Sequence, residues 1–464
     1  MADLSALSKL PGVDRVLQSD DLAPLRDRLS DDYLADFIRM GVEQVRKDIL
    51  KGKPRADDLM AEVVSKVVVA VNAFLAPSLR RVVNATGVVL HTNMGRAPLP
   101  ESAVKRIVGI ASGYTNLELD LETGERGSRT SLVESLLVRI TGGEAAAVVN
   151  NNAAAVLLGL NTLAQGKEVV VSRGQLVEIG GSFRIPDIME RSGATMVEVG
   201  TTNRTHQKDF SSAITDQTGL LLSVHPSNYE VVGFTSEVAL AELVEIGHAR
   251  NIPILHDLGA GCLIDTRKMG LGYEPLVSDS IEAGANLVTF SGDKILGGPQ
   301  CGILVGTAEA ITKVRENPLM RALRCDKLTY AALEATLQLF LNRESIVEAH
   351  PVVGMLTESQ EDVRKRAEQL ADFIGKIDGS LDVVDSEGQV GSGSLPAKRV
   401  ASAAVRIIPG SRSVAKVARQ LRKGVLPVIG YTRDGALHLD ARTIFPDDLP
   451  AVAEAVQSAM GKGT

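Results

Sequence analysis

The sequence predicts an α/β protein whose central domain is a mostly parallel sheet covered by helices on both faces. Two observations predict this fold class. Short apolar and β-branched runs recur between residues 79 and 341, and they alternate with segments of helical periodicity, as in βαβ units. Glycines or short polar residues follow several of these runs, at the sheet edge where such folds bind ligands. The predicted strands cover residues 146–149, 169–172, 196–199, 220–224, 254–256 and 287–290.

The first 78 residues show no strand-like alternation and predict a small helical domain. Apolar residues follow helical spacing from Leu34 to Val45 and again from Leu59 to Val67. A basic cluster then falls within ten positions and could be a solvated helix end, which composition favours, or a contact for a phosphate backbone. It consists of Arg46, Lys47, Lys51, Lys53 and Arg55.

The last part of the chain, residues 342–464, predicts a small α+β domain. A charged helix is expected over residues 358–377, followed by short strands separated by glycines. We expect these strands at residues 391–394, 403–408, 426–429 and 436–439. The chain is thus expected to have a helical domain of residues 1–78, a large domain of residues 79–341 and this C-terminal domain.

Composition narrows the class of protein. The 464 residues carry a formal net charge of −7, which gives no general attraction to nucleic acid, so any RNA contact has to be local. Three cysteines without paired or metal-type spacing argue against a disulfide framework and a structural zinc site. No signal peptide is recognisable, and polar residues interrupt the longest uncharged run, residues 145–166. We therefore expect a soluble, cytoplasmic protein.

The first polar group at a strand end is Asn150–Asn152, which follows the strand at residues 146–149 and precedes a helical run. Backbone N–H groups and short polar side chains at a helix start form an anion site, here with Asn151 and Asn152. Asparagines are also ordinary helix caps. Alone, this motif leaves both interpretations open.

The second group is Asp257, at the tip of the strand at residues 254–256 and followed by glycines. A buried aspartate needs a partner that compensates its charge, and a protonated pyridine nitrogen is one such partner. At an effective dielectric near 20, a contact of about 3 to 4 Å contributes about 4 to 5 kcal/mol before desolvation is subtracted. Such a contact would keep the ring protonated as an electron sink.

The third group is the segment Ser291–Lys294, which ends an apolar strand and precedes a Gly-Gly-Pro turn. A lysine held in a glycine-lined loop can form an imine, while the hydroxyl of Ser291 can reach a phosphate. By itself the lysine could equally be a solvated hairpin residue. Asp257 precedes Lys294 by 37 residues, about one helix and one strand, which places both at the same edge of the sheet. Together the three groups form the pattern of pyridoxal-phosphate enzymes of the aspartate-aminotransferase fold type.

Longer motifs occur in order along the chain. They include VVNATGVVLHTNMGRAPL (residues 82–99), VNNNAAAVLL (149–158), EVGTTNRTH (198–206), VHPSNY (224–229), FSGDKILGGPQ (290–300), RALRCDK (321–327) and PVIGYTRDG (427–435). These motifs resemble the bacterial selenocysteine synthases, a family of L-seryl-tRNA(Sec) selenium transferases that use pyridoxal 5′-phosphate. The resemblance covers essentially the whole chain.

The resemblance implies roles for single residues. Lys294 would carry the pyridoxal phosphate, with Asp257, Ser291, Asn151 and Asn152 around the cofactor. For His225 two interpretations stay open, a role beside the cofactor through ring stacking or a hydrogen bond, or no such role, whereas a structural role is expected for His256. Asp293 would lie in the site next to the lysine. The family's active-site arginines, which form an anion pocket for selenophosphate, fall on Arg96, Arg129, Arg321 and Arg324.

Arg321 and Arg324 would share one face if their segment is helical. The cysteines near these motifs, Cys301 and Cys325, carry no mark of a nucleophile and are expected to be buried thiols.

The resemblance also implies a reaction and an assembly. Loss of water from serine esterified to tRNA(Sec) would give an aminoacrylyl intermediate, and selenium from selenophosphate would add to it. The family forms homodecamers, pentamers of dimers, whose N-terminal domain binds the tRNA. The alternative is a pyridoxal-phosphate lyase or eliminase acting on a free small amino acid or a phosphorylated amino sugar acid. The helical N-terminal domain favours the tRNA substrate, because a small-molecule enzyme would not need it.

Overall fold

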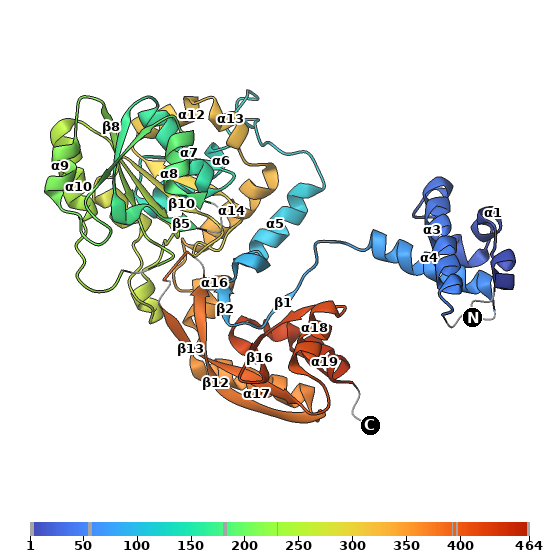
Figure 1. The fold of residues 1–464 in the computed structure, drawn as a ribbon. Coiled ribbons are helices and arrows are strands. Elements are labelled where there is room, and N and C mark those ends of the chain that lie inside the picture. Colours follow the sequence, from blue (N-terminus) through green and yellow to red (C-terminus); the bar gives the residue numbers. More distant parts are fainter. Residues whose placement is uncertain are drawn as a thin grey trace. The chain divides into compact units, whose positions relative to one another are not determined.

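The computed structural model of the chain describes residues 4–53, 58–179, 183–229, 231–391, 393–395 and 398–461. The chain forms two compact units, Met1–Arg81 and Val82–Thr464, each of which is drawn in Figure 1. The boundary between them lies close to the expected end of the N-terminal domain at residue 78.

The first unit is helical, as expected. Its two long helices pack through residues at helical spacing, with Ile38 and Val45 of one helix and Val63 and Val67 of the other in the same buried cluster. Asp58 caps the start of the second long helix. Its carboxylate accepts a hydrogen bond from the backbone N–H of Met60 (2.8 Å). The helices are α1 (Val13–Leu17), α2 (Ala23–Arg26), α3 (Asp31–Leu50) and α4 (Leu59–Leu75).

The basic cluster, which begins in the last turns of α3 and continues beyond it, is partly neutralised. Lys53 forms an ion pair with Asp48 (2.8 Å), and Arg46 forms one with Glu43 (3.2 Å). Arg55 lies outside the described residues.

The second unit is built on a seven-stranded sheet that confirms the predicted fold class. All strands run parallel except β11, which pairs antiparallel with both of its neighbours. The predicted strands are all present, whereas β11 was not predicted. In spatial order the strands are β3 (Ala145–Val149), β11 (Gly302–Gly306), β10 (Leu287–Ser291), β9 (Ile254–Gly259), β8 (Thr218–Val224), β4 (Glu168–Ser172) and β7 (Thr195–Val199).

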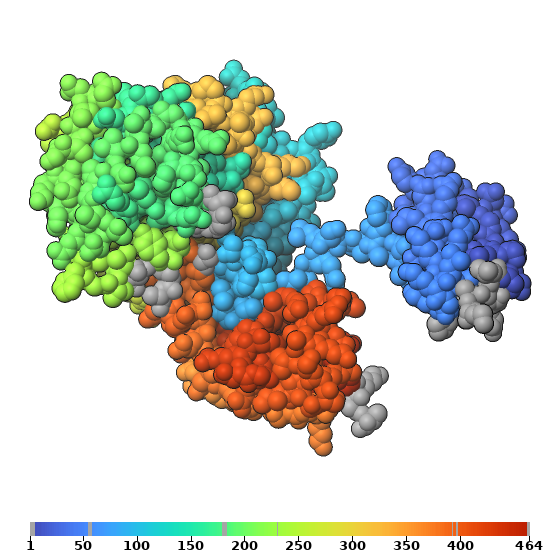
Figure 2. All heavy atoms as spheres, in the orientation of Figure 1, coloured from blue at the N-terminus to red at the C-terminus, as the bar shows by residue number. Residues whose placement is uncertain are grey.

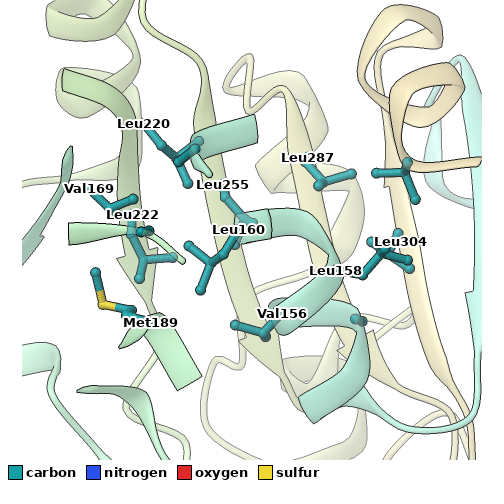
Figure 3. Close-up of a cluster of buried hydrophobic side chains, with 14 of the residues drawn as sticks. Val156, Leu158, Leu160, Val169, Met189, Leu220, Leu222, Leu255, Leu287 and Leu304 are labelled. Carbon is teal, nitrogen blue, oxygen red and sulfur yellow. The ribbon is translucent and has the colours of Figure 1, made fainter. Parts of the chain in front are cut away.

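Helices cover both faces of this sheet because alternate residues of its strands point to opposite sides and nearly all are apolar. On one face lie α7 (Asn152–Ala164), α8 (Ile185–Arg191) and α12 (Ala308–Glu316). Figure 3 shows Leu158 and Leu160 of α7 against strand residues such as Leu255. The other face is covered by α6 (Ser131–Thr141), α9 (Gln207–Ala213), α10 (Leu240–Arg250), α11 (Val277–Glu282) and α14 (Lys327–Leu339).

A five-stranded sheet forms the C-terminal part of the second unit. It contains two long strands where the sequence predicted short ones, and the strand expected at residues 391–394 is only the end of β12, with Ser392 outside the described residues. In spatial order the strands are β15 (Tyr431–Arg433), β16 (Ala436–Asp440), β13 (Arg399–Pro409), β12 (Gly379–Gly391) and β2 (Val88–Leu90). The predicted helix at residues 358–377 is α17 (Gln360–Ile374).

The segment that follows Arg81 joins this C-terminal sheet, although the sequence assigned it to the large domain. Strand β1 (Val83–Asn84) pairs with β14 (Val428–Ile429), and β2 pairs with the end of β12. In Figure 2 the light-blue surface of this segment lies against the orange-red C-terminal surface. The remaining helices are α5 (Glu101–Ala111), α13 (Leu319–Leu323), α15 (Ile346–Ala349), α16 (Pro351–Thr357), α18 (Val414–Lys423) and α19 (Leu449–Met460), and β5 (Glu178–Ile179) pairs with β6 (Phe183–Arg184).

The described residues contain no cluster of three or more His, Cys, Asp or Glu side chains that could hold a metal ion. The three cysteines are buried and free. Within the described parts, we find no helix with the length and apolar character needed to cross a bilayer.

Candidate active site

A cavity of about 250 Å³ lies at the carboxyl ends of the central strands. Strands β3, β8, β9 and β10 end around it, so polar residues that are far apart in the sequence meet there. Seven of the predicted site residues line this cavity: Arg96, Asn151, Asn152, His225, Asp257, Ser291 and Lys294.

Lys294 lies in a tight loop after β10, and its side chain lines the cavity. The backbone of Gly292 accepts from Gly298 (2.8 Å), and the carbonyl of Lys294 accepts from Gly297, whose φ is +68°. Glycine is needed at Gly292 as well, because a Cβ there would lie 2.4 Å from Cys301 Sγ. The lysine is only 6% exposed. Burial lowers its pKa, and the negative charge of Asp257 opposes that shift.

Asp257 lies within β9, whose residues are all buried, and is 5% exposed. Its Oδ1 accepts two hydrogen bonds, from Asn152 Nδ2 (2.8 Å) and from Thr289 Oγ1 (2.9 Å). Thr289 is the direct cross-strand partner of Asp257 in β10. Burial raises the pKa of this carboxyl, while the bonds from Asn152 and Thr289 act in the opposite sense. Neither of these two bonds uses Oδ2.

The groups around the cavity fit pyridoxal phosphate. Asn152 Oδ1 and Ser227 Oγ are buried without a hydrogen-bond partner among the described residues, and both residues line the cavity. Buried polar atoms without a hydrogen-bond partner in the chain are typical of a site that binds a polar ligand. The start of α7, capped by Asn151 Oδ1 on the N–H of Ala154 (2.9 Å), offers backbone donors for a phosphate.

The C-terminal part of the unit closes the space beside the lysine. Gly393, just beyond β12, has φ of +80°, and a Cβ there would lie 2.5 Å from Lys294 Nζ. At the end of β9, a Cβ at Gly259 would lie 3.6 Å from the same nitrogen. Gly393 thus leaves room for the lysine amine, whereas a Cβ at Gly259 would only be in ordinary contact with it.

Arg96 and Asp293 form an ion pair at the edge of the cavity. Arg96 Nη1 donates to Asp293 Oδ2 at 2.8 Å, and the side chains are 30% and 9% exposed. Arg96 adopts the left-handed conformation with φ of 62°, which turns the chain after β2. The sequence placed Asp293 next to the lysine without a defined partner, and in the structure its carboxylate pairs with Arg96.

The other predicted arginines do not line the cavity. Arg129 Nε donates to Glu118 Oε1 (2.6 Å), and Arg324 Nη1 lies 3.4 Å from the same oxygen. Arg126 Nη2 reaches Glu118 Oε2 (2.8 Å), so one carboxylate holds three guanidinium groups. Arg129 and Arg126 lower the pKa of Glu118, chiefly through the hydrogen bond from Arg129.

Arg321 is exposed and makes no side-chain hydrogen bond or ion pair with the described residues. The expected shared helical face of Arg321 and Arg324 is wrong, because α13 ends at Leu323 and Arg324 is extended. The backbone of Arg324 instead forms an antiparallel bridge with Val149, the last residue of β3. This bridge places Arg324 near the start of α7.

The two histidines of the neighbouring strands differ. His256 is 8% exposed, and its Nδ1 shares a hydrogen bond with Ser280 Oγ (3.0 Å). Burial lowers the pKa of His256 to about 3. His225 lines the cavity, and its Nε2 lies 3.5 Å from Glu274 Oε1. The thiols of Cys301 and Cys325 are buried, and burial raises the pKa of each, to about 12 for Cys325.

Sequence reasoning missed four residues of this neighbourhood: Ser227, Thr289, Glu118 and Glu274. Thr289 carries a signal, since a polar residue within a buried apolar strand and beside a predicted site residue needs a polar partner. Ser227 lies in the VHPSNY motif but no chemistry singled it out. Glu118 and Glu274 lie in loops without a local pattern.

Comparisons with known proteins identify the family of the chain. A family model described as L-seryl-tRNA selenium transferase (SelA) matches residues 82–445. The L-seryl-tRNA(Sec) selenium transferase of Geobacter sulfurreducens is 46% identical, and the match covers 98% of this chain and 99% of the relative. The enzyme of that name from Alkaliphilus oremlandii is 44% identical over 97% of both chains.

Among solved structures, a D-glucosaminate-6-phosphate ammonia-lyase matches with a TM-score of 0.56 and 18% identity, over 83% of this chain and 99% of that one. This likeness shows a shared fold. The match of the family model and the identities to full-length relatives show more: the chain belongs to the L-seryl-tRNA selenium transferase family.

Proposed function

We propose that the protein converts L-seryl-tRNA(Sec) to L-selenocysteinyl-tRNA(Sec), with pyridoxal 5′-phosphate as cofactor and selenophosphate as selenium donor. The observation that carries the proposal is the buried pair of Lys294 and Asp257 on one cavity, in a chain of this family. Its relatives bear the name of this activity.

Four residues would hold the cofactor. Lys294 Nζ would bind its aldehyde carbon, and the Asp257 carboxylate would face its ring nitrogen. Ser291 and the start of α7 at Asn152 would take its phosphate. When bound, pyridoxal phosphate supplies an electron sink for bond breaking at the serine Cα.

The chain's own groups would then move protons and hold charges. Burial lowers the pKa of Lys294, so its amine gives up a proton more readily and is suited to take the proton from the serine Cα. The buried Asp257 carboxylate would keep a positive charge on the ring nitrogen. Arg96, fixed by Asp293 in the cavity wall, would orient an anionic group of the substrate.

Selenophosphate would bind to guanidinium groups, which pair bidentately with phosphate oxygens. Arg129, Arg321 and Arg324 are the candidates. Arg129 and Arg324 already share Glu118, so a bound anion would have to replace that carboxylate or be held together with it. A homo-oligomer, a decamer built from dimers, belongs to this proposal. Exposed apolar side chains around α5, among them Val108, Tyr114 and Leu121, support contact with another copy.

The tRNA would be bound by the helical unit of residues 1–81. Its separate core and its basic cluster support this assignment. Location in the cytoplasm remains a prediction from the sequence.

The alternative function is that of a lyase acting on a free small amino acid or a phosphorylated amino sugar acid. The chain shares its fold with the ammonia-lyase, but a likeness at 18% identity does not indicate the same substrate. An experiment separates the two functions. The cofactor-loaded protein is incubated with seryl-tRNA(Sec), with free serine or with D-glucosaminate 6-phosphate. We expect loss of the serine hydroxyl from the tRNA ester only. Release of ammonia from a free substrate, with the ester unchanged, would establish the lyase instead.

A further inference from the structure

Glu274 is a buried carboxylate outside every motif that the sequence analysis used. The residue is 3% exposed, and its Oε1 is buried without a hydrogen bond to any residue that the structure describes. A buried polar atom of this kind is costly unless something compensates it, so it calls for an explanation. The group that faces this oxygen is the imidazole of His225, with 3.5 Å between Nε2 and Oε1.

Hydrogen bonds fix the loop that carries Glu274. Its backbone N–H donates to Thr266 Oγ1 (3.1 Å), and that hydroxyl donates to the carbonyl of Gly272 (2.6 Å). Thr266 starts the 3-10 helix η5 (Thr266–Met269) and is fully buried. These bonds fix the backbone of Glu274, and burial of the residue limits the positions that its carboxylate can take, so the carboxylate can orient a partner.

The backbone of His225 is held by a hydrogen bond, whereas its ring forms none with the residues that the structure describes. It follows β8, and its N–H donates to the carbonyl of Asp257 (2.9 Å). Its side chain is 25% exposed and lines the same cavity as Lys294. Without Glu274, the ring orientation would be free at the point where it meets the cavity.

The charged and titratable groups around this pair are Asp257, Lys294, His256 and Cys262. The pKa of His256 is lowered chiefly by burial and, to a smaller extent, by electrostatic interaction with His225. Glu274 is one of the negative groups that, after Asp257, oppose the burial of the Lys294 ammonium. Glu274 therefore lies close enough to the lysine to belong to its surroundings.

We propose that Glu274 is a positioning residue of the cavity. In the cofactor-bound protein the 3.5 Å between Oε1 and Nε2 shortens to a hydrogen bond, in which the carboxylate accepts the Nε2–H of His225 and thereby selects one tautomer and one ring orientation. Nδ1 is then the nitrogen that remains for the bound cofactor. The inference rests on the proposed function, because it takes the ligand of the cavity to be pyridoxal phosphate.

A double-mutant cycle tests this inference. The variants are Glu274→Gln, His225→Gln and the double variant of the full-length chain, and the measured quantity is the dissociation constant of pyridoxal 5′-phosphate from absorbance titration. A glutamine amide either accepts from Nε2–H or donates to bare Nε2, so it no longer selects a tautomer. We expect Glu274→Gln to weaken binding about fivefold in the wild-type background and less than about twofold in the His225→Gln background.

A matched control comes from helix α11, which contains Ser280. Ser280→Ala removes the hydrogen-bond partner of His256, which does not line the cavity, and it should leave the dissociation constant unchanged. Thermal unfolding of the cofactor-free variants checks that they fold. If Glu274→Gln fails this check, Glu274→Ala takes its place in the cycle.

Equal losses from the glutamate substitution in both backgrounds would overturn the inference, because Glu274 would then act without His225. Unchanged binding in the single variant would overturn it as well. Failure of the proposed function gives a different result: the wild-type chain would bind the cofactor, and the cycle could be read, while seryl-tRNA(Sec) stayed unconverted.

Discussion

Burial shifts the two ionisable groups at the centre of the cavity towards their neutral forms. It lowers the pKa of the Lys294 amine and raises the pKa of the Asp257 carboxyl. Each shift prepares the group for a partner: a neutral amine can attack an aldehyde, and a buried acid gains most from a nearby cationic ring nitrogen. The chemistry therefore depends on the packing around these two side chains.

Lys294→Ala tests the covalent role of the lysine. We expect the purified variant to lack the absorbance band of lysine-bound pyridoxal phosphate, because no other amine is described in the cavity lining. Lys313→Ala, which removes an exposed lysine paired with Glu309, should keep the band. An unchanged spectrum of the Lys294 variant would contradict the assignment of Lys294 as the lysine that binds pyridoxal phosphate.

Arg321→Ala tests the anion pocket. The side chain is exposed and outside the cavity lining, so cofactor binding should be unchanged. Selenium transfer should fall by about tenfold or more, since loss of one guanidinium–phosphate contact costs at least about 1.4 kcal/mol. Transfer at the wild-type rate, measured with saturating seryl-tRNA(Sec), would show that Arg321 does not bind the selenium donor.

His256 should make the protein sensitive to acid. Its pKa is about 3 in the folded chain against 6.5 as the ordinary value, so between these values the unfolded chain binds the extra proton. Stability from this group is complete above pH 6.5 and is lost as pH falls towards 3, by about 2 kcal/mol at pH 5.

The measurement is the free energy of unfolding at pH 7 and pH 5, from denaturant titration. His256→Asn, whose amide can replace Nδ1 as partner of Ser280, should show a smaller drop between the two pH values than the wild type. The same drop in both proteins would contradict the assignment.

At the scale of elements, the sequence predicted the positions of strands but not all of their pairings. The runs that became β8, β9 and β10 are apolar and β-branched because both faces of these strands are buried, and this local property is readable. The antiparallel strand β11 follows a Gly-Gly-Pro turn, and nothing in its composition sets its direction. Strands β1 and β2 pair with residues near the other end of the chain, which leaves no local signature.

The same distinction holds for the site. Asp257 and Lys294 were predictable because each follows a strand and their spacing fits one helix and one strand. The gathering of Arg126, Arg129 and Arg324 on Glu118 was not, because it depends on side chains brought together by tertiary structure. Glu274 lies in a loop whose path is set by hydrogen bonds, so only the structure places it beside His225.

Gly393→Ala tests the junction between the C-terminal sheet and the lysine loop. The new Cβ would lie 2.5 Å from Lys294 Nζ, so the amine has to move, and we expect pyridoxal phosphate to bind about tenfold more weakly. Gly435→Ala is the matched control, because Gly435 has a similar φ of +74° with open space around its Cβ position. If the two substitutions weaken cofactor binding equally, backbone strain alone explains the loss of affinity.

At the scale of the whole molecule, the chain consists of two units with separate cores. The unit of residues 82–464 contains every residue of the cavity, and the unit of residues 1–81 contributes none. This division agrees with a chain that needs one surface for chemistry and another for a large substrate.

Deletion of residues 1–81 tests the division. The shortened chain should keep the absorbance of the bound cofactor, because the cavity and its supporting sheets are intact. Its affinity for tRNA(Sec) should fall by at least about tenfold at physiological salt, since the basic cluster is lost. A filter-binding or mobility-shift titration measures this affinity. Affinity equal to that of the full chain would place the tRNA contacts in the second unit.

The most direct test of the function is analysis of the amino acid esterified to tRNA(Sec) after incubation with the cofactor-loaded protein and selenophosphate. We predict that selenocysteine replaces serine on the tRNA, and that Lys294→Ala leaves serine in place. Serine that remains unconverted by the wild-type protein, with its cofactor bound and both substrates present, would contradict the account.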